Sequence, residues 1–357
     1  MTYVDNCSVE ILTNSIQLLN LSDEEYFSDI YANYTSNSRL KLINPLEGGS
    51  PKKYFNPPKQ DYSKNLEFGS AIHAKILQPS KFEIIADYQH KPGGKLGVFI
   101  EKVVYYRKLH YPIYKALLQA SEDTNYYVGK LKGRILQNTI KSGLRYYLDY
   151  YYNIFNLDNN KTPIVLSPST LISVQDCLQR YENSSICSFL NKQNITGSKE
   201  FFFEQAILLH IKVTLPTKQS VIIPFKLKID NYTIDNDEDI ITLNDLKTTG
   251  INIQYFMGQK VWNEKTEEFE GFLGSFQVYH YYRQMAVYLY VLQLLYGPKY
   301  TYQANILAIE SSGMYNSSIF PISNAYIKKG IDEFKELMCR VAFHTINGIN
   351  KQFDYDT

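Results

Sequence analysis

The sequence has few of the residues that build metal clusters, disulfide scaffolds or membrane spans. Its four cysteines, Cys7, Cys177, Cys187 and Cys339, lie far apart, form no Cys-x-x-Cys pair and have no histidine cluster near them. This argues against zinc and iron–sulfur sites and favours scattered reduced thiols. No apolar run reaches the length of a membrane span. The N-terminus lacks a basic stretch followed by an apolar one, so we expect no signal peptide, no membrane partner and a cytoplasmic location.

The chain also has no excess of charge of either sign. Its 357 residues include 37 basic and 36 acidic side chains, and the net charge of +1 indicates no polyanionic partner. The length is enough for one large domain or two modest ones, and the hydrophobic share of 44% is ordinary for a globular protein with a core. Tyrosine is abundant, at 32 residues. Because Tyr, Asn, Ile and Lys share AT-rich codons, this composition is compatible with a phage or an AT-rich bacterium, and the expected cytoplasm is bacterial or that of a phage-infected host.

The period of the hydrophobic pattern changes along the chain. Short helices are expected over residues 1–45, and a longer one over 66–77 that ends at Pro79. Helical patterns return at 168–192, 276–296 and 323–349. Strand patterns separated by turn residues occur at 201–215, 220–230, 239–247, 302–310 and 317–323. The order predicts an α/β fold with a mixed central sheet flanked by helices, plus a helical N-terminal and insert region.

One stretch differs from the rest in charge. Between Lys91 and Arg145 there are 11 basic and 3 acidic side chains, with tyrosines interleaved. Two interpretations stay open: a solvated helical face with tyrosines in its core, or a DNA channel that neutralises phosphates and stacks on bases. We therefore expect three regions: N-terminal helices (1–84), a helical, basic, tyrosine-rich insert (85–198), and the core sheet with C-terminal helices (199–357).

Polar side chains interrupt two of the predicted strands. In "FKLKID", strand alternation puts Lys226, Lys228 and Asp230 on one face and three apolar side chains on the core face. In "NDLKTT", Asp245 and Lys247 share a face, and Leu246 is expected to point into the core.

Two adjacent strands joined by a turn can bring Asp230, Asp245 and Lys247 together. Neighbouring carboxylates repel unless a proton or a cation lies between them, and hard oxygen ligands suit Mg²⁺ or Mn²⁺. A lysine beside such a cation can donate to a phosphate oxygen or orient a water, which fits metal-assisted phosphodiester hydrolysis. Taken alone, Asp-x-Lys is more often a surface ion pair.

Five landmarks in order make the sequence resemble the PD-(D/E)XK nuclease superfamily, with its restriction-endonuclease-like core, and within it the RecB- and RecE-like exonucleases of phage type. The resemblance runs discontinuously from about Ser36 to Glu310. Lys228 stands where many relatives have arginine, and the cysteines that some relatives use for an iron–sulfur cluster are absent. The landmarks are "TSNSRLKLINP" (Ser-x-Leu helix), "LEFGSAIHAKIL" (Gly-x-x-x-His helix), "EQAILLHIKV" (strand with a glutamate), "FKLKID" with "ITLNDLKTT" (the Asp and Asp-x-Lys strands) and "YYRQMAVYLY" (Gln-x-x-x-Tyr helix).

The resemblance implies roles for individual residues. His73, Asp230, Asp245 and the carbonyl of Leu246 would hold Mg²⁺, with Mn²⁺ as a substitute. Lys247 would position the attacking water and steady the developing charge. The remaining catalytic candidates are Glu204, Gln284 and Tyr288.

Other interpretations remain open for three of these residues. His73 could be a core histidine and Tyr288 a packing residue. Glu204 could be solvated or form an ion pair with Lys226. Glu310, at the end of a strand, is expected to be structural.

The implied function is a Mg²⁺-dependent deoxyribonuclease, most simply an exonuclease at the ends of double-stranded DNA, in recombination, repair or phage DNA metabolism. The resemblance further implies DNA, a single-strand annealing protein and copies of this chain in a ring-shaped homo-oligomer as partners. A catalytically inactive DNA-binding or structural protein on the same fold is an alternative. An endonuclease, or the nuclease subunit of a helicase complex, is another.

Overall fold

The computed structural model describes residues 6–58, 64–86, 93–126, 141, 143–145, 162–187, 190, 198–263 and 268–351. The chain divides into two compact units, one formed by residues 1–77 with 176–357 and the other by residues 78–175. The expected regions 1–84, 85–198 and 199–357 have different limits and stay a prediction. Within the described ranges, no helix is long and apolar enough to cross a membrane.

A seven-stranded mixed sheet forms the centre of the first unit, in the order β1-β5-β6-β7-β10-β11, with β2 also paired to β5. Strands β5, β6 and β7 are antiparallel, and β10 joins β7 in parallel. The predicted mixed central sheet is confirmed. The strands are β1 (Ser8–Ile11), β2 (Gln17–Leu19), β5 (Lys199–Thr214), β6 (Ser220–Asp235), β7 (Ile240–Thr249), β10 (Thr301–Glu310) and β11 (Ser317–Pro321).

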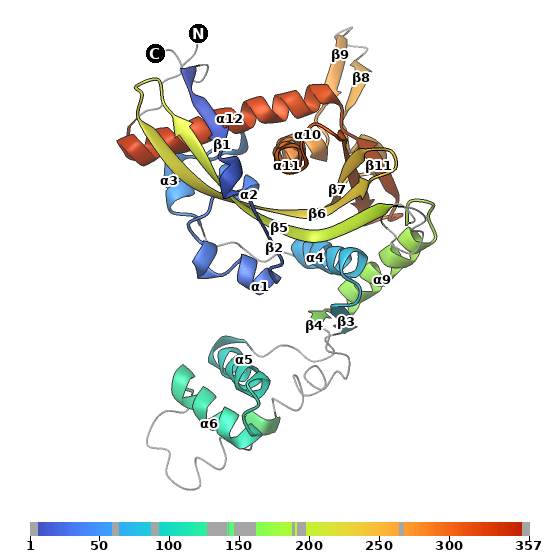
Figure 1. The fold of residues 1–357 in the computed structure, drawn as a ribbon. Helices are drawn as coiled ribbons and strands as arrows, with labels where there is room; N and C mark the ends of the chain where they lie inside the picture. The colour runs from blue at the N-terminus through green and yellow to red at the C-terminus, as the bar shows by residue number, and fades with distance from the viewer. Residues whose placement is uncertain are drawn as a thin grey trace. The chain divides into compact units, whose positions relative to one another are not determined.

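Helices flank this sheet on both faces (Figure 1). Two long helices cover one face and bury the main core, as in the edge-to-face contact of Phe225 with Phe334, whose ring centroids are 5.7 Å apart. On the other face α4 lies close to β7, because Gly69 has no Cβ: an added one would lie 3.0 Å from Oγ1 of Thr248. The helices of this unit are α1 (Asp23–Tyr26), α2 (Asn37–Leu40), α3 (Pro51–Phe55), α4 (Lys64–Leu77), α10 (Ser275–Val278), α11 (Tyr281–Tyr296) and α12 (Asn324–Asn347).

The predicted short N-terminal helices are present, and the same segment also contains two strands that were not predicted. Strands β1 and β2 add to the edge of the sheet by pairing with β5. β1 is only four residues long, and Ile11 at its end is buried in the core that the distant β5 supplies. Short strands of this kind depend on a partner far away in sequence, so local periodicity does not reveal them.

Two further differences affect the loops. The predicted helix 276–296 is interrupted at His280, whose φ of 50° is left-handed, so α10 and α11 are separate. A hairpin of β8 (Gln259–Asn263) and β9 (Glu268–Phe272) lies where only a loop was expected.

The turn after the second long strand also starts later than predicted. Strand β6 continues through Asp235 and pairs with β7 from Asn231 onward. Asp230 therefore lies inside β6, not at its tip.

The second unit contains a helical hairpin, α5 (Gly94–Lys108) and α6 (Ile113–Thr124), and a parallel pair, β3 (Phe82–Ala86) and β4 (Thr162–Leu166). α9 (Pro168–Glu182) crosses the boundary after residue 175. Lys102 and Lys115 lie over the rings of Tyr105 and Tyr111, at 5.2 and 4.6 Å. Much of the predicted basic stretch, including residues 127–140, lies outside the described residues, so both interpretations of it remain predictions.

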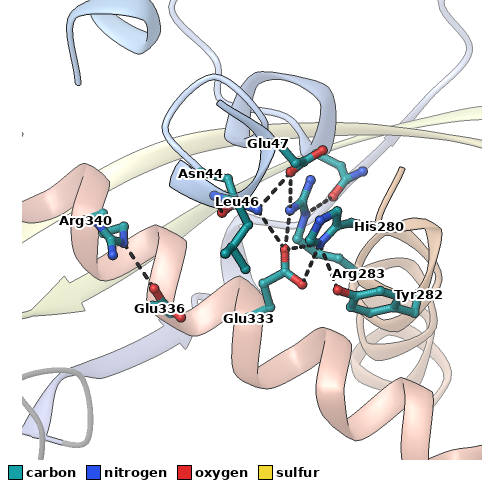
Figure 2. Close-up of polar contacts among 10 residues, drawn as sticks. Asn44, Leu46, Glu47, His280, Tyr282, Arg283, Glu333, Glu336 and Arg340 are labelled. Atoms are coloured by element: carbon teal, nitrogen blue, oxygen red, sulfur yellow. Dashed lines mark hydrogen bonds and ion pairs between the residues drawn. The ribbon is translucent and has the colours of Figure 1, made fainter. Parts of the chain in front are cut away.

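A buried ion-pair network ties α11 to α12 and to the N-terminal segment (Figure 2). The Arg283 side chain is 1% exposed and its Nη1 donates to Glu47 at 2.9 Å and to Glu333 at 2.5 Å. Nδ1 of His280 lies 2.8 Å from Glu333. Glu47, His280 and Glu333 have the spacing of a metal site. The guanidinium of Arg283 already supplies the cation, so the group is an ion-pair network.

Candidate active site

The predicted site residues gather where β6 and β7 separate. The ladder between them ends at Asn231 and Asn244, whose side chains are joined by a 2.8 Å hydrogen bond. Beyond this pair β7 continues beside β10, whereas β6 continues beside β5. A gap therefore opens in the sheet, and backbone groups on both edges need partners other than the neighbouring strand, as Thr35 provides for Pro224 and Lys226.

Two of the predicted site residues accept hydrogen bonds from backbone N–H groups at the edges of this gap. The N–H of Leu246 on β7 donates to Oδ2 of Asp230 at 2.8 Å. The hydroxyl of Tyr288, buried on α11, accepts a hydrogen bond from the N–H of Lys228 on β6. Both interactions replace ladder bonds that the parted strands no longer make, which keeps the gap open without leaving buried donors unpaired.

Glu204 and Asp230 face each other across β5 and β6 at a point where both strands leave the regular alternation. Their neighbours on either side are paired, but they are not. Ile229 and Tyr232 both belong to the main core, so the inward positions on β6 change from odd to even residues here. Glu204 has a φ of 52°, which is rare for a residue other than glycine. Such a conformation in mid-strand is a frequent mark of a functional site.

Three side chains converge at this point from three elements. His73 on α4, Glu204 on β5 and Asp230 on β6 offer ligand atoms that all lie within 4.8 Å of one another. The ring of His73 also donates to the backbone carbonyl of Leu246. An imidazole, two carboxylates and a nearby carbonyl form a hard donor set that fits a divalent cation.

Asp245 lies beside this group without belonging to it. Its Oδ2 is 2.6 Å from Nζ of Lys247, and its Oδ1 accepts from Nε2 of Gln284 at 2.8 Å. The ammonium of Lys247 also lies 5.2 Å from the ring centroid of Tyr281. Asp245 is 1% exposed, so its charge depends on these partners from β7 and α11.

The predicted orientation of β7 is reversed. Asp245 and Lys247 lie on the face that carries Ile241 and Leu243, the face that α11 and α12 cover, while Leu246 is buried on the opposite face. A polar pair fits within that core because α11 carries Gln284 toward it. The site is thus assembled around the gap, not on one face of the sheet.

The electrostatics of the site favour a bound cation. Burial raises the pKa of Glu204 and of Asp230, and the charge of Asp230 raises that of Glu204 further. Burial, followed by the charge of Lys247, lowers the pKa of His73, which keeps the imidazole neutral and able to act as a ligand. Crowded carboxyls with raised pKa values are typical of functional sites.

Glu204 forms an ion pair with Lys228 and not with Lys226, the partner considered from the sequence. Its carboxylate contacts Nζ of Lys228. Lys226 instead donates to the carbonyl of Tyr26 at 2.7 Å and lies over that ring. Glu310 accepts backbone N–H groups of two loops, at 2.8 and 3.0 Å, which agrees with a structural role.

The C-terminal part of the site falls within a match to a known family. Residues 211–347 match the family described as "PDDEXK-like domain of unknown function (DUF3799)". The match supports a PDDEXK-like domain over these residues, which include Asp230, Asp245, Lys247, Gln284 and Tyr288. No curated protein matches the chain. Solved structures similar to it include a "putative exonuclease" from Eubacterium rectale, at 14% identity and a TM-score of 0.47, over 94% of this chain and 90% of that one.

Binding of Mn²⁺ is expected to weaken as the pH falls through about 6. Burial raises the pKa of the two ligand carboxyls, Glu204 and Asp230. Burial, opposed by Lys247 and reinforced by Asp230, also raises the pKa of Asp245, whose charge lies beside the ligand group, from an ordinary 3.8 to about 6. A cation must displace protons from such carboxyls, so acid competes with the metal. A carboxyl whose pKa rises on folding also destabilises the metal-free fold as the pH rises from 3.8 past 6. Calorimetric Mn²⁺ titrations across this range provide the test, and an affinity that stays constant through pH 6 would contradict it.

Proposed function

We propose that the protein is a metal-dependent deoxyribonuclease of the RecB/RecE-like type that degrades double-stranded DNA from its ends. One observation carries the proposal: the His73, Glu204 and Asp230 ligand group lies beside the buried Asp245–Lys247 pair, at the gap between β6 and β7. These residues come from four elements, and folding brings them together with ligand groups on one side and a fixed ammonium on the other.

The residues divide into holding and positioning roles. His73, Glu204, Asp230 and the Leu246 carbonyl would hold Mg²⁺, with Asp245 beside them. A bound divalent ion makes a water more acidic and offsets phosphate charge. Lys247 would orient the attacking water and would stabilise the charge that develops on the phosphate. Gln284 fixes Asp245, and Asp245 in turn fixes the ammonium of Lys247.

The resemblance also motivates the finer parts of the proposal. They are a role in recombination, repair or phage DNA metabolism, a ring-shaped homo-oligomer, and a single-strand annealing partner.

Incubation with linear and covalently closed circular DNA of one sequence tests the reaction type. With Mg²⁺ we expect the linear DNA to be shortened progressively from its ends and the closed circle to persist, because an exonuclease acts only at free ends. EDTA should stop the degradation. Cleavage of both substrates would identify an endonuclease. Cleavage of neither, with DNA binding intact, would identify an inactive binding protein.

A further inference from the structure

One lysine links the ligand group to a residue outside it. Nζ of Lys228 contacts Oε2 of Glu204 and Oδ1 of Asp23. The Lys228 side chain is 13% exposed, and the two carboxylates are 16% and 54% exposed. A single ammonium is therefore shared between an inner carboxylate at the ligand group and an outer one at the surface.

The outer carboxylate is fixed in place by its helix. Asp23 is the first residue of α1, and Ser22 before it forms a capping box with Glu25. The Ser22 hydroxyl accepts the N–H of Glu25 at 3.2 Å, and the Glu25 carboxylate accepts the N–H of Ser22 at 2.8 Å. Asp23 is thus presented to Lys228 by a capped turn.

The inner carboxylate, that of Glu204, has two possible cationic partners. Oε2 of Glu204 contacts the ammonium of Lys228, and Glu204 also offers a ligand atom to the group with His73 and Asp230. An ammonium that attracted only Glu204 would compete directly with a metal ion for that carboxylate. A second carboxylate on the same ammonium weakens this competition, because it shares the positive charge.

We propose that Asp23 is a positioning residue of the metal site: by sharing the ammonium of Lys228, it leaves the Glu204 carboxylate available to a divalent cation. The inference rests on the metal site of the proposed function. It does not depend on which nucleic acid, if any, is cleaved. Replacement of residues that contact metal ligands without binding the metal themselves typically changes metal affinity by about 10–100-fold.

Calorimetric titration of the full chain with Mn²⁺ tests this. Asp23→Asn is expected to weaken Mn²⁺ binding about tenfold, the lower end of that range. The matched control is Glu24→Gln. Glu24 is exposed and lies in the same first turn of α1, and its replacement removes the same charge. The control should change the affinity by no more than about twofold, since surface charges act weakly at a distance. Asp23→Glu should restore most of the affinity.

A double-mutant cycle separates positioning from a general charge effect. If Asp23 acts through Lys228, Asp23→Asn should have little further effect on Mn²⁺ binding in a Lys228→Gln background. Thermal melts establish that each variant is folded. Equal effects of Asp23→Asn and Glu24→Gln, additive effects in the cycle, or no Mn²⁺ binding by the unaltered protein would each overturn the inference. A protein that binds Mn²⁺ with this pattern but cleaves no DNA would overturn the nuclease proposal alone.

Discussion

Replacement of Lys247 by methionine is expected to slow the hydrolysis of linear DNA by about 10²–10³-fold at saturating Mg²⁺. Its ammonium lies 2.6 Å from Asp245 and is placed over Tyr281, beside the ligand group but not part of it. The fixed positive charge can therefore act on the phosphate without holding the metal. Single-turnover digestion of end-labelled DNA measures the effect.

The assay should be run well above pH 6. Lys247 lowers the pKa of Asp245, so without Lys247 the Asp245 carboxyl would keep its proton to a higher pH than about 6. The changed charge beside the ligand group would then alter metal binding as well as catalysis. Lys226→Met is the matched control, because Lys226 lies on the neighbouring strand and bonds to the carbonyl of Tyr26. The control should keep nearly full activity. If Lys247→Met retained activity within about tenfold of the unaltered protein, its assigned role would be wrong.

Replacement of Arg283 by methionine is expected to reduce the free energy of unfolding by about 3–5 kcal/mol. Arg283 is 1% exposed and neutralises Glu47 and Glu333, which lie 2.9 and 2.5 Å from its Nη1 (Figure 2). Its removal leaves two carboxylates buried without their counter-charge. Urea denaturation followed by circular dichroism measures the change.

The network also bears on the site, because Arg283 precedes Gln284 on α11. In folded Arg283→Met we expect slower DNA hydrolysis, since the helix that presents Gln284 to Asp245 loses one of its polar contacts with α12. Arg180→Met, on the exposed surface of α9, is the matched control and should change stability by no more than about 0.5 kcal/mol. A loss of under about 1 kcal/mol in Arg283→Met would show that water or rearrangement replaces the ion pairs.

Local patterns predicted much of the central architecture. The alternation in "FKLKID" identified Phe225, Leu227 and Ile229 as core, and all three are fully buried. The pattern of 302–310 predicted β10, which spans Thr301–Glu310. In "FKLKID" the burial follows from side-chain alternation, whereas β10 is an apolar run whose residues from Ile306 to Glu310 are all buried.

The same alternation failed at the site itself. The prediction required β6 and β7 to stay paired up to Asp230 and Asp245, whereas the pairing of these strands ends at Asn231 and Asn244. It also could not reveal that Glu204 adopts a left-handed φ of 52°, which turns its carboxylate toward Asp230. No local pattern marks either event, because both arise where strands from different parts of the chain part from one another.

By itself, the sequence determined which residue types are available: a histidine four residues after a glycine on one helix, acidic residues within apolar strands, and a lysine two residues beyond Asp245. The tertiary structure alone decided how they are combined. It placed Glu204 in the ligand group with His73 and Asp230, and it paired Asp245 with Lys247 beside this group. It also brought Asp23 into contact with the ammonium of Lys228. The physical reason is that charges removed from water must find partners in space, and partners as far apart in sequence as Lys228 and Asp23, at 205 positions, are brought together by the packing of the sheet and its helices.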